Sequence, residues 1–402
     1  IGIYLVVCTQ EEGALRIDFR GIGEVDLFQR LPAALSVAAL QVDVHTLIIS
    51  CFTPPVVESV AWLPVTPDPA VIEINMAPVP QATELLSRLR LLEEVATEQG
   101  LSTFRLQYNG MESDSGGGGH VTFGGARPME SPFLTVPSLL PSLVRYFNRH
   151  PSLSYLHAPE SVGPASQAPR VDESLHQALP ELSLALELLS RVDNPHPETL
   201  WGTLAPFLSD PSGNSHRAEI NIEKLWNPHL GGRGRLGLVE FRALRMGPAP
   251  ETTASIAALL RAVVAMLADH PSDQPLIDWG RALHQRFSLP FYLHQDLREV
   301  LAELDDAGFG LGERIVHYLL RDRDLILATR DLGAFRLEVR RALEFWPLVG
   351  DVATQERGGS RLIDASAARI EVRLRCSNGS DGLDAWTLAV GDWAIPLRDA
   401  QD

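Results

Sequence analysis

The sequence predicts an α+β protein, and three observations predict this class. Apolar residues recur at helical spacing in several stretches, of which Gln81–Gln99 and Thr253–Leu267 are the clearest. Short strand candidates lie between Val71 and Arg242, and they carry polar side chains at alternate positions. Further strand candidates follow Gly333 near the end of the chain.

The first 60 residues give mixed signals. Ile1–Cys8 favours a strand, whereas Glu24–Leu40 and Val42–Phe52 alternate between helical and strand-like patterns. Two prolines, Pro54 and Pro55, break whatever precedes them. The sequence TPDP at residues 66–69 is typical of a turn, and it leads into the strand candidate VIEIN at residues 71–75.

The middle of the chain is predicted to alternate between helices and strands. The helix Gln81–Gln99 ends at Gly100, and a strand over Ser102–Tyr108 follows. A polar, glycine-rich loop then leads to GGGGHVTFGG at residues 116–125. Further helices are predicted over Val136–Arg149, Glu173–Arg191 and Pro195–Leu208. The loop between the first two of these helices is long, and long ordered loops are more often functional.

Two strand candidates follow, SHRAEINIEKLW at residues 215–226 and RLGLVEFRALRM at residues 235–246. A short Gly/Arg loop joins them, which predicts a hairpin or near neighbours. After the helix from Thr253, helices are predicted over Ile277–Phe287 and Asp296–Ala307. Strands then return over residues 335–343, 368–376, 385–390 and 393–397. The predicted division is an N-terminal segment (1–60), a core (61–270), a helical segment (271–332) and a β-rich region (333–402).

Composition excludes several classes of function. The chain has 402 residues and a formal net charge of -17, so a general basic surface for nucleic acid is not expected. The three cysteines lie far apart without zinc-ligand spacing, which fits a reducing cytosol. No apolar run reaches the roughly 18 residues that span a bilayer. We therefore expect a cytoplasmic protein with no nucleic-acid or membrane partner.

Polar pairs at alternate strand positions mark the candidate site, because alternate residues of a strand share a face. The pairs are Glu73 with Asn75, His120 with Thr122, Arg217 with Glu219, and Glu240 with Arg242. A face with acids, an imidazole and guanidinium groups suits metal ions and an anionic substrate. The alternatives are a solvated edge strand for the first pair and surface ion pairs for the two arginine–glutamate pairs.

The glycine run is the second candidate feature. Gly116–Gly119 lack Cβ atoms, so their backbone N–H groups could approach an anion closely. The GK[ST] ending of a P-loop is missing, and a strand rather than a helix is predicted next. A flexible hairpin, with His120 bonded to the backbone, is the alternative.

The segment QAPRVDE at residues 167–173 is a third candidate feature. Asp172 suits a helix cap there, and Arg170 is the residue expected to have a role beyond the helix start. Helical zinc motifs and a GxSxG elbow are absent.

These motifs together resemble a known fold and family. VIEIN, GGGGHVTFGG, RAEIN and GLVEFRALR, in that order, are similar to the glutamine-synthetase and glutamate–cysteine-ligase fold. VTPDPAVIEIN, GPASQAPRVDE, GNSHRAEINIEKLW and RRALEFWPLVG resemble a bacterial family of uncharacterised domains found with transglutaminase-like domains. Its members are proposed amidoligases, and the likeness spans about residues 50 to 400. The resemblance implies a curved, mainly antiparallel sheet backed by helices in a glutamine-synthetase-like catalytic domain.

The resemblance also implies an activity, which is ATP-dependent amide formation from a carboxylate and an amine through an acyl phosphate. ATP and Mg²⁺, with Mn²⁺ as an alternative, are the implied cofactors. The partners would be small-molecule or peptide substrates and a transglutaminase-like domain in the same chain or operon. By motif, Glu73, His120 and Glu240 match metal-binding positions, and His120 also lies near the nucleotide phosphates. Arg242 and Arg217 match phosphate-contacting arginines, and Gly117, Gly118 and Gly119 would admit the nucleotide, while Asn75, Glu219 and Arg170 are weaker candidates.

One departure leaves alternatives open. The fold supplies further metal-binding glutamates from an early strand, and no such segment precedes Glu73; Glu11, Glu12 and Asp18 have no matching context. The chain is therefore a partial record of the protein, or its metal site is incomplete and the domain is inactive. A degenerate ligase domain that binds a transglutaminase-like partner is thus the second hypothesis. Metal-dependent amide hydrolysis in the same cleft is the third.

Overall fold

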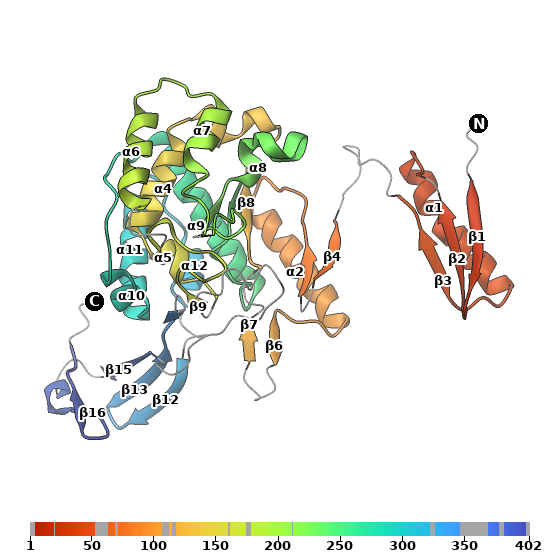
Figure 1. Cartoon of the computed structure of the whole chain (residues 1–402). Coiled ribbons are helices and arrows are strands. Elements are labelled where there is room, and N and C mark those ends of the chain that lie inside the picture. The colour runs from red at the N-terminus through yellow and green to blue at the C-terminus, as the bar shows by residue number, and fades with distance from the viewer. Residues whose placement is uncertain are drawn as a thin grey trace. The chain divides into compact units, whose positions relative to one another are not determined.

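A computed structural model describes most of the chain. The chain forms two compact units. The N-terminal unit is Ile1–Pro78 and the main unit is Val79–Asp402. Figure 1 labels the helices and strands of each unit. The described residues are 5–19, 21–52, 63–68, 71–106, 112–114, 118–159, 161–173, 178–210, 212–321, 326–345, 369–377 and 382–398.

In its described residues, the N-terminal unit contains a three-stranded sheet and one helix. Strands β1 (Val6–Glu11) and β2 (Ala14–Phe19) form an antiparallel hairpin, and Gly13 supplies its left-handed turn residue at φ 77°. Helix α1 (Val25–Gln41) then leads to β3 (Leu47–Ser50), which pairs parallel to β2. The helix and strand signals that overlapped in the sequence thus belong to α1 and β3.

A second hairpin in this unit corrects one prediction. β4 (Val65–Asp68) pairs antiparallel with β5 (Val71–Ile74), and Pro67 lies opposite Ile72. The predicted strand at VIEIN is confirmed, but Thr66, Pro67 and Asp68 belong to a strand rather than a turn. Proline is tolerated there because β4 is at the edge of a two-stranded sheet and its missing N–H costs no ladder bond.

Helices build the core of the main unit (Figure 1). The predicted helices at 81–99, 136–149, 173–191 and 195–208 are observed as α2, α4, α6 and α7, of which α2 and α7 are shorter at both ends. The later ones are α9, α10 and α11, and α12 was not predicted. Their bounds are α2 (Ala82–Glu98), α4 (Leu139–Arg149), α6 (Ala178–Ser190), α7 (Pro197–Leu204), α9 (Pro250–Asp269), α10 (Ala282–Phe287), α11 (Pro290–Asp306) and α12 (Glu313–Leu319).

Helix α9 lies at the centre of this core and packs against α2, α4, α11 and α12. Among the described residues it is the one helix long and apolar enough to cross a membrane, and 56% of its most apolar window is buried. Leu260 and Val263 are almost fully enclosed by other core residues. This burial is typical of a core helix, which passes the same test of length and composition.

A small antiparallel sheet lies beside this core, with the order β10–β11–β8. Its strands are β8 (Val121–Phe123), β10 (Ile220–Asn221) and β11 (Val239–Phe241). The long strand predicted over residues 215–226 is wrong. Only Ile220 and Asn221 are in the ladder, and Glu223–Trp226 forms the short helix α8. The Asn221 side chain explains the break, because its amide donates to Ser215 O and its oxygen accepts from Glu223 N.

The C-terminal part is rich in strands, as predicted. β13 (Phe335–Arg341) pairs antiparallel with β12 (Ile326–Leu332) and with β15 (Ile370–Cys376), and β16 (Leu388–Val390) pairs with β17 (Trp393–Ile395). β14 (Glu344–Phe345) pairs parallel with β9 (Ser161–Val162), so this part joins the helical core through the long loop. Shorter elements are β6 (Phe104–Leu106), β7 (Glu112–Asp114), η1 (Pro128–Glu130), α3 (Pro132–Thr135), α5 (Ser152–Tyr155), η2 (Val171–Glu173), η3 (Pro228–Gly234) and η5 (Leu383–Ala385).

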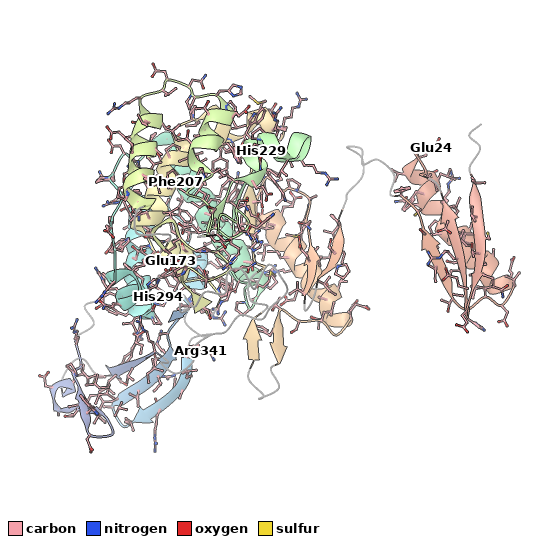
Figure 2. All side chains as sticks on the ribbon, viewed as in Figure 1. Glu24, Glu173, Phe207, His229, His294 and Arg341 are labelled. Atoms are coloured by element: carbon pink, nitrogen blue, oxygen red, sulfur yellow. The ribbon has the colours of Figure 1, made fainter. Side chains whose placement is uncertain are left out.

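The α+β prediction is confirmed, because helices and small, mostly antiparallel sheets make up the described residues. Side chains from the helices and from the β10–β11–β8 sheet fill one continuous apolar core in the main unit (Figure 2). The four-part domain division stays a prediction.

Candidate functional site

Strand β11 separates a buried apolar face from a polar one. Val239 and Phe241 are buried, and the Phe241 ring packs on Phe123 and Phe147. Glu240 and Arg242 alternate with them and are half-buried. The predicted alternation is therefore confirmed, and the strand presents a carboxylate and a guanidinium on the side away from the core.

Three predicted residues meet on this polar side. His120 Nδ1 lies 3.1 Å from Glu240 Oε1, and Arg242 donates to the same oxygen at 3.1 Å. Burial opposes ionisation of Glu240, but the bond to His120 and the charge of Arg242 outweigh it and lower its pKa to about 2. Glu240 is thus a carboxylate at neutral pH, held between two nitrogen donors.

The Glu240 carboxylate also determines that Nδ1 of the His120 ring carries a hydrogen. An ionised carboxylate only accepts hydrogen bonds, so Nδ1 must be the donor and carry a hydrogen. In the neutral ring, Nε2 then presents a lone pair. Among the described residues this Nε2 atom is buried without a hydrogen-bond partner, as is Arg242 Nε. A histidine that donates from one nitrogen to a carboxylate and leaves the other bare is the usual arrangement of a metal-bound imidazole.

His120 and Glu240 supply only part of the ligand set of a divalent metal ion. The described residues contain no group of three or more His, Cys, Asp or Glu side chains that could hold a metal ion. Mg²⁺ is usually bound through one or two carboxylates together with substrate phosphates and water rather than by a cage of protein ligands. His120 and Glu240 therefore suit a metal that arrives with a ligand.

The glycine run has an additional role in packing. Gly116 and Gly117 lie outside the described residues. Gly118 adopts φ 94° and forms a β-bridge with Arg245, and Gly119 N donates to Leu244 O at 3.3 Å. A Cβ on Gly119 would lie 2.1 Å from the Arg245 carbonyl oxygen. Glycine is required at this position because two backbones approach too closely for any side chain.

Glu73 and Asn75 belong to the N-terminal unit. Both are exposed, and Asn75 Nδ2 donates to Glu73 Oε1 at 2.8 Å, so they share a face as predicted. The structure does not place this unit relative to His120 and Glu240. The metal role of Glu73 stays a prediction.

Arg217 is buried and holds the long loop. Its guanidinium donates to the carbonyl oxygens of Ala165 (2.8 Å) and Ser166 (2.9 Å), and it forms an ion pair with Asp210 at 2.9 Å. These contacts come from a bend rather than from the predicted strand, and Arg217 and Glu219 contact different groups. The observed contacts give Arg217 a structural role, and its contact with phosphate stays a prediction.

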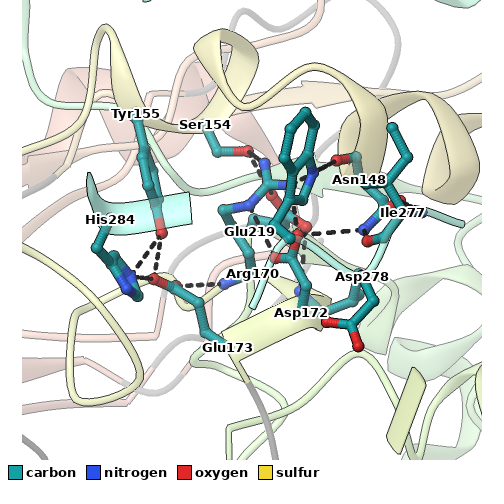
Figure 3. A network of polar contacts seen from close by, with 12 residues as sticks. Asn148, Ser154, Tyr155, Arg170, Asp172, Glu173, Glu219, Ile277, Asp278 and His284 are labelled. Carbon is teal, nitrogen blue, oxygen red and sulfur yellow. Dashed lines mark hydrogen bonds and ion pairs between the residues drawn. The ribbon is translucent and has the colours of Figure 1, made fainter. Parts of the chain in front are cut away.

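Arg170 and Glu219 lie in a buried polar network (Figure 3). Arg170 donates to both oxygens of Asp172 at 2.9 and 3.0 Å and to Asn148 O at 3.0 Å. Glu219 accepts from Ser154 Oγ and from Val171 N, and its Oε2 lies 3.6 Å from Arg170. Burial raises the pKa of Glu219 to about 7, although Arg170 opposes the shift. Both side chains therefore brace the loop against α5.

The network connects to the candidate site through the backbone of Glu219. Glu219 N donates to Pro169 O at 3.1 Å, and Arg242 N donates to Glu219 O at 2.9 Å. The backbone of Glu219 thus hydrogen-bonds both to the loop that carries Arg170 and to the segment that carries Arg242. The site roles of Arg170 and Glu219 stay a prediction.

Sequence reasoning missed several members of this network. Tyr155 and His284 both contact Glu173 Oε1, the latter at 2.7 Å, and Glu173 Oε2 accepts from Arg170 N at 2.9 Å. Asn148 donates to Asp172 and also binds the backbone of Ile277. The Asp172 and Glu173 pair beside Arg170 is the one available signal, and its pattern predicts a helix start with Asp172 as the cap. His284 lies more than 100 residues away, and nothing local marks it.

The comparison with known families adds one positive finding. A family model described as "Putative amidoligase enzyme (DUF2126)" matches residues 4–402. The chain belongs to this family. The amidoligase part of the resemblance is therefore confirmed, and this family assignment supports a ligase-type function. No curated protein and no solved structure matches this DUF2126 chain.

Proposed function

We propose that the chain is an ATP- and Mg²⁺-dependent carboxylate–amine ligase whose nucleotide and metal bind at His120, Glu240 and Arg242. One observation carries the proposal. His120 Nδ1 and Arg242 both contact Glu240 Oε1, and among the described residues His120 Nε2 is buried without a hydrogen-bond partner. Membership of the amidoligase family supports the same reaction class.

Each residue has a distinct part in this proposal. His120 Nε2 and a remaining lone pair of Glu240 would hold the metal, and Arg242 would stabilise negative charge on a phosphoryl group. ATP, when bound, would supply the phosphoryl group that turns the substrate carboxylate into an acyl phosphate, which an amine then displaces. Gly118 and Gly119 would border the nucleotide, because they run beside the backbone of Leu244 and Arg245.

Further parts of the proposal come from the resemblance. They are the glutamine-synthetase-like curved sheet, a metal role for Glu73, phosphate contact by Gly117 and Arg217, a cytoplasmic location and a transglutaminase-like partner. The antiparallel order of β10, β11 and β8 supports the fold proposal at the level of one small sheet.

A degenerate binding domain is the alternative function, and one observation favours it. The described residues hold no cluster of three metal-ligand side chains around His120 and Glu240. In that case the domain would bind a transglutaminase-like partner without turning over ATP.

Calorimetric titration with Mg-ATP tests the proposal. We expect Glu240→Gln to weaken binding 10- to 100-fold, because loss of the orienting carboxylate frees the His120 ring. Arg233→Gln is the matched control, since Arg233 is exposed on η3, and its affinity should equal that of the wild type. Wild-type protein that does not bind Mg-ATP, or a Glu240→Gln variant that binds it equally well, would refute the proposal.

A further inference from the structure

A small cavity lies between the segment after β11 and the start of α9. Polar lining comes from His157, Arg245, Thr252, Tyr318 and Arg321, and apolar lining comes mainly from Leu156, Ile256 and Leu319. Its volume is about 20 Å³. That is room for about one water-sized group, so only the tip of a ligand could enter.

The charge of this lining is positive, although the protein as a whole is acidic. The whole chain has 51 acidic residues against 34 lysines and arginines. Two arginines nevertheless line the cavity, and none of its described lining residues is an acid. The guanidinium carbon of Arg321 lies 5.9 Å from the centre of the Tyr318 ring, and this cation–π contact orients the guanidinium. The cavity therefore has the field that attracts an anion.

His157 supplies a buried donor at the same place. Its Nε2 atom is buried and has no hydrogen-bond partner among the described residues. Burial, together with the charge of Arg245, lowers the pKa of His157 to about 3, so the ring is neutral at physiological pH. A neutral imidazole can place its one hydrogen on Nε2 and donate it to an acceptor. A buried polar atom without a partner costs free energy that a ligand could recover.

The start of α9 adds a weaker positive charge to the cavity. Ala249 occupies the N-cap position of this helix, and its methyl side chain cannot accept a hydrogen bond from the first turn. The first turn of a long helix carries a partial positive charge. Thr252, in that turn, lines the cavity.

We propose that this cavity binds one terminal oxyanion, a carboxylate or a phosphate oxygen, of a small ligand. His157, Arg245 and Arg321 contact the oxyanion, and the wall of Leu156, Ile256 and Leu319 contacts the carbon atoms next to it. The site lies along the same backbone as the candidate active site. Arg245 follows Arg242 by three residues, and it pairs with Gly118.

This inference goes beyond the ligase proposal and does not rest on ATP binding. If both hold, the cavity is a recognition site for an acidic group of the substrate beside the reacting centre. If the chain is a binding domain without catalysis, the cavity is still an anion site.

Line broadening of two probes tests the inference. Inorganic phosphate is followed by ³¹P NMR, and carboxyl-labelled acetate is followed by ¹³C NMR. Arg321→Gln is the main variant, because Arg321 is exposed and its loss should not prevent folding. His157→Gln is the second variant, and circular dichroism checks that both are folded. Arg233→Gln is the control, because it removes the same charge at an exposed position elsewhere.

We expect at least one probe to bind the wild type and the Arg233→Gln control equally. Arg321→Gln and His157→Gln should each weaken that binding about tenfold, as expected for loss of one hydrogen bond to a charged group. Preference for acetate assigns a carboxylate, and preference for phosphate assigns a phosphate. The inference fails if neither probe binds, if both cavity variants bind like the wild type, or if Arg233→Gln loses binding as much as they do. Loss of Mg-ATP binding in Glu240→Gln with unchanged probe binding would show that the two sites are separate.

Discussion

Glu240 determines the chemistry of the residues around it. Its carboxylate accepts from His120 and from Arg242, and these two contacts keep it ionised despite partial burial. Because the carboxylate fixes a hydrogen on His120 Nδ1, Nε2 is the nitrogen that we propose as the metal ligand. The same oxygen therefore organises a candidate metal ligand and a candidate phosphate contact.

Glu219 differs from Glu240 because burial dominates its environment. Its pKa is raised from 4.5 to about 7. An acid with a raised folded pKa retains its proton in the folded state while the unfolded chain loses it, so stability falls as pH rises from about 4.5 to 7. The loss from this group is about 3 kcal/mol, since each pKa unit corresponds to about 1.4 kcal/mol.

Glu219→Gln should remove this pH dependence, because glutamine does not titrate. Guanidinium unfolding of both proteins at pH 5 and pH 8 measures it. We expect the free energy of unfolding to fall less between these pH values in the variant than in the wild type. Equal falls in the two proteins would show that Glu219 titrates normally.

For single residues, the sequence predicted which polar side chains share a strand face better than it predicted what those side chains contact. Alternation along VEFR placed Glu240 and Arg242 on one face correctly, because a strand fixes the direction of its side chains. The same reasoning paired Arg217 with Glu219, but the chain bends there and sends them to different partners. Contacts such as His284 with Glu173 depend on tertiary packing, which no local pattern contains.

The elements around the candidate site are held by close backbone packing. β8 and the glycines before it run antiparallel to β11 and the residues after it. Gly119 is buried where the Arg245 carbonyl comes nearest. This approach places His120 beside Glu240 without any contribution from a residue-119 side chain.

Gly119→Ala should destabilise the protein by about 2–4 kcal/mol, because the added methyl overlaps the Arg245 backbone. Gly202→Ala is the matched control. Gly202 lies inside α7 with nothing within 4 Å of an added Cβ, so alanine should be neutral or stabilising by about 0.5–1 kcal/mol. Chemical unfolding measures both. A tolerated Gly119→Ala substitution would mean that the run is needed for ligand access alone.

Helices were predicted more accurately than strands in the main unit. Apolar periodicity located α2 and α9 within a few residues, because a long helix repeats its signal several times. β10 has only two residues in the ladder, and the side chain of Asn221 ends it. Such short strands depend on their neighbours, so their extent could not be predicted from alternation.

One apolar core joins the helices and the β10–β11–β8 sheet of the main unit, and α9 contributes buried residues to it from Ile256 to Leu267. Its composition alone would also fit a membrane span. Leu260→Ala should cost about 2–5 kcal/mol of unfolding free energy, because Leu260 is 1% exposed. Leu188→Ala on α6 is the control, since Leu188 is 50% exposed and its loss should cost less than about 1 kcal/mol. Equal effects in urea unfolding would contradict a core role for α9.

The most direct test of the proposed site is electron spin-echo spectroscopy of the protein with Mn²⁺ and ATP, in which Mn²⁺ replaces Mg²⁺. The account predicts ¹⁴N coupling from His120 Nε2 in the wild type. The coupling should disappear in His120→Gln and persist in the control His270→Gln, because His270 is exposed after α9. Wild-type protein without ¹⁴N coupling, or a His120→Gln variant that retains it, would contradict a metal–nucleotide site at His120 and Glu240.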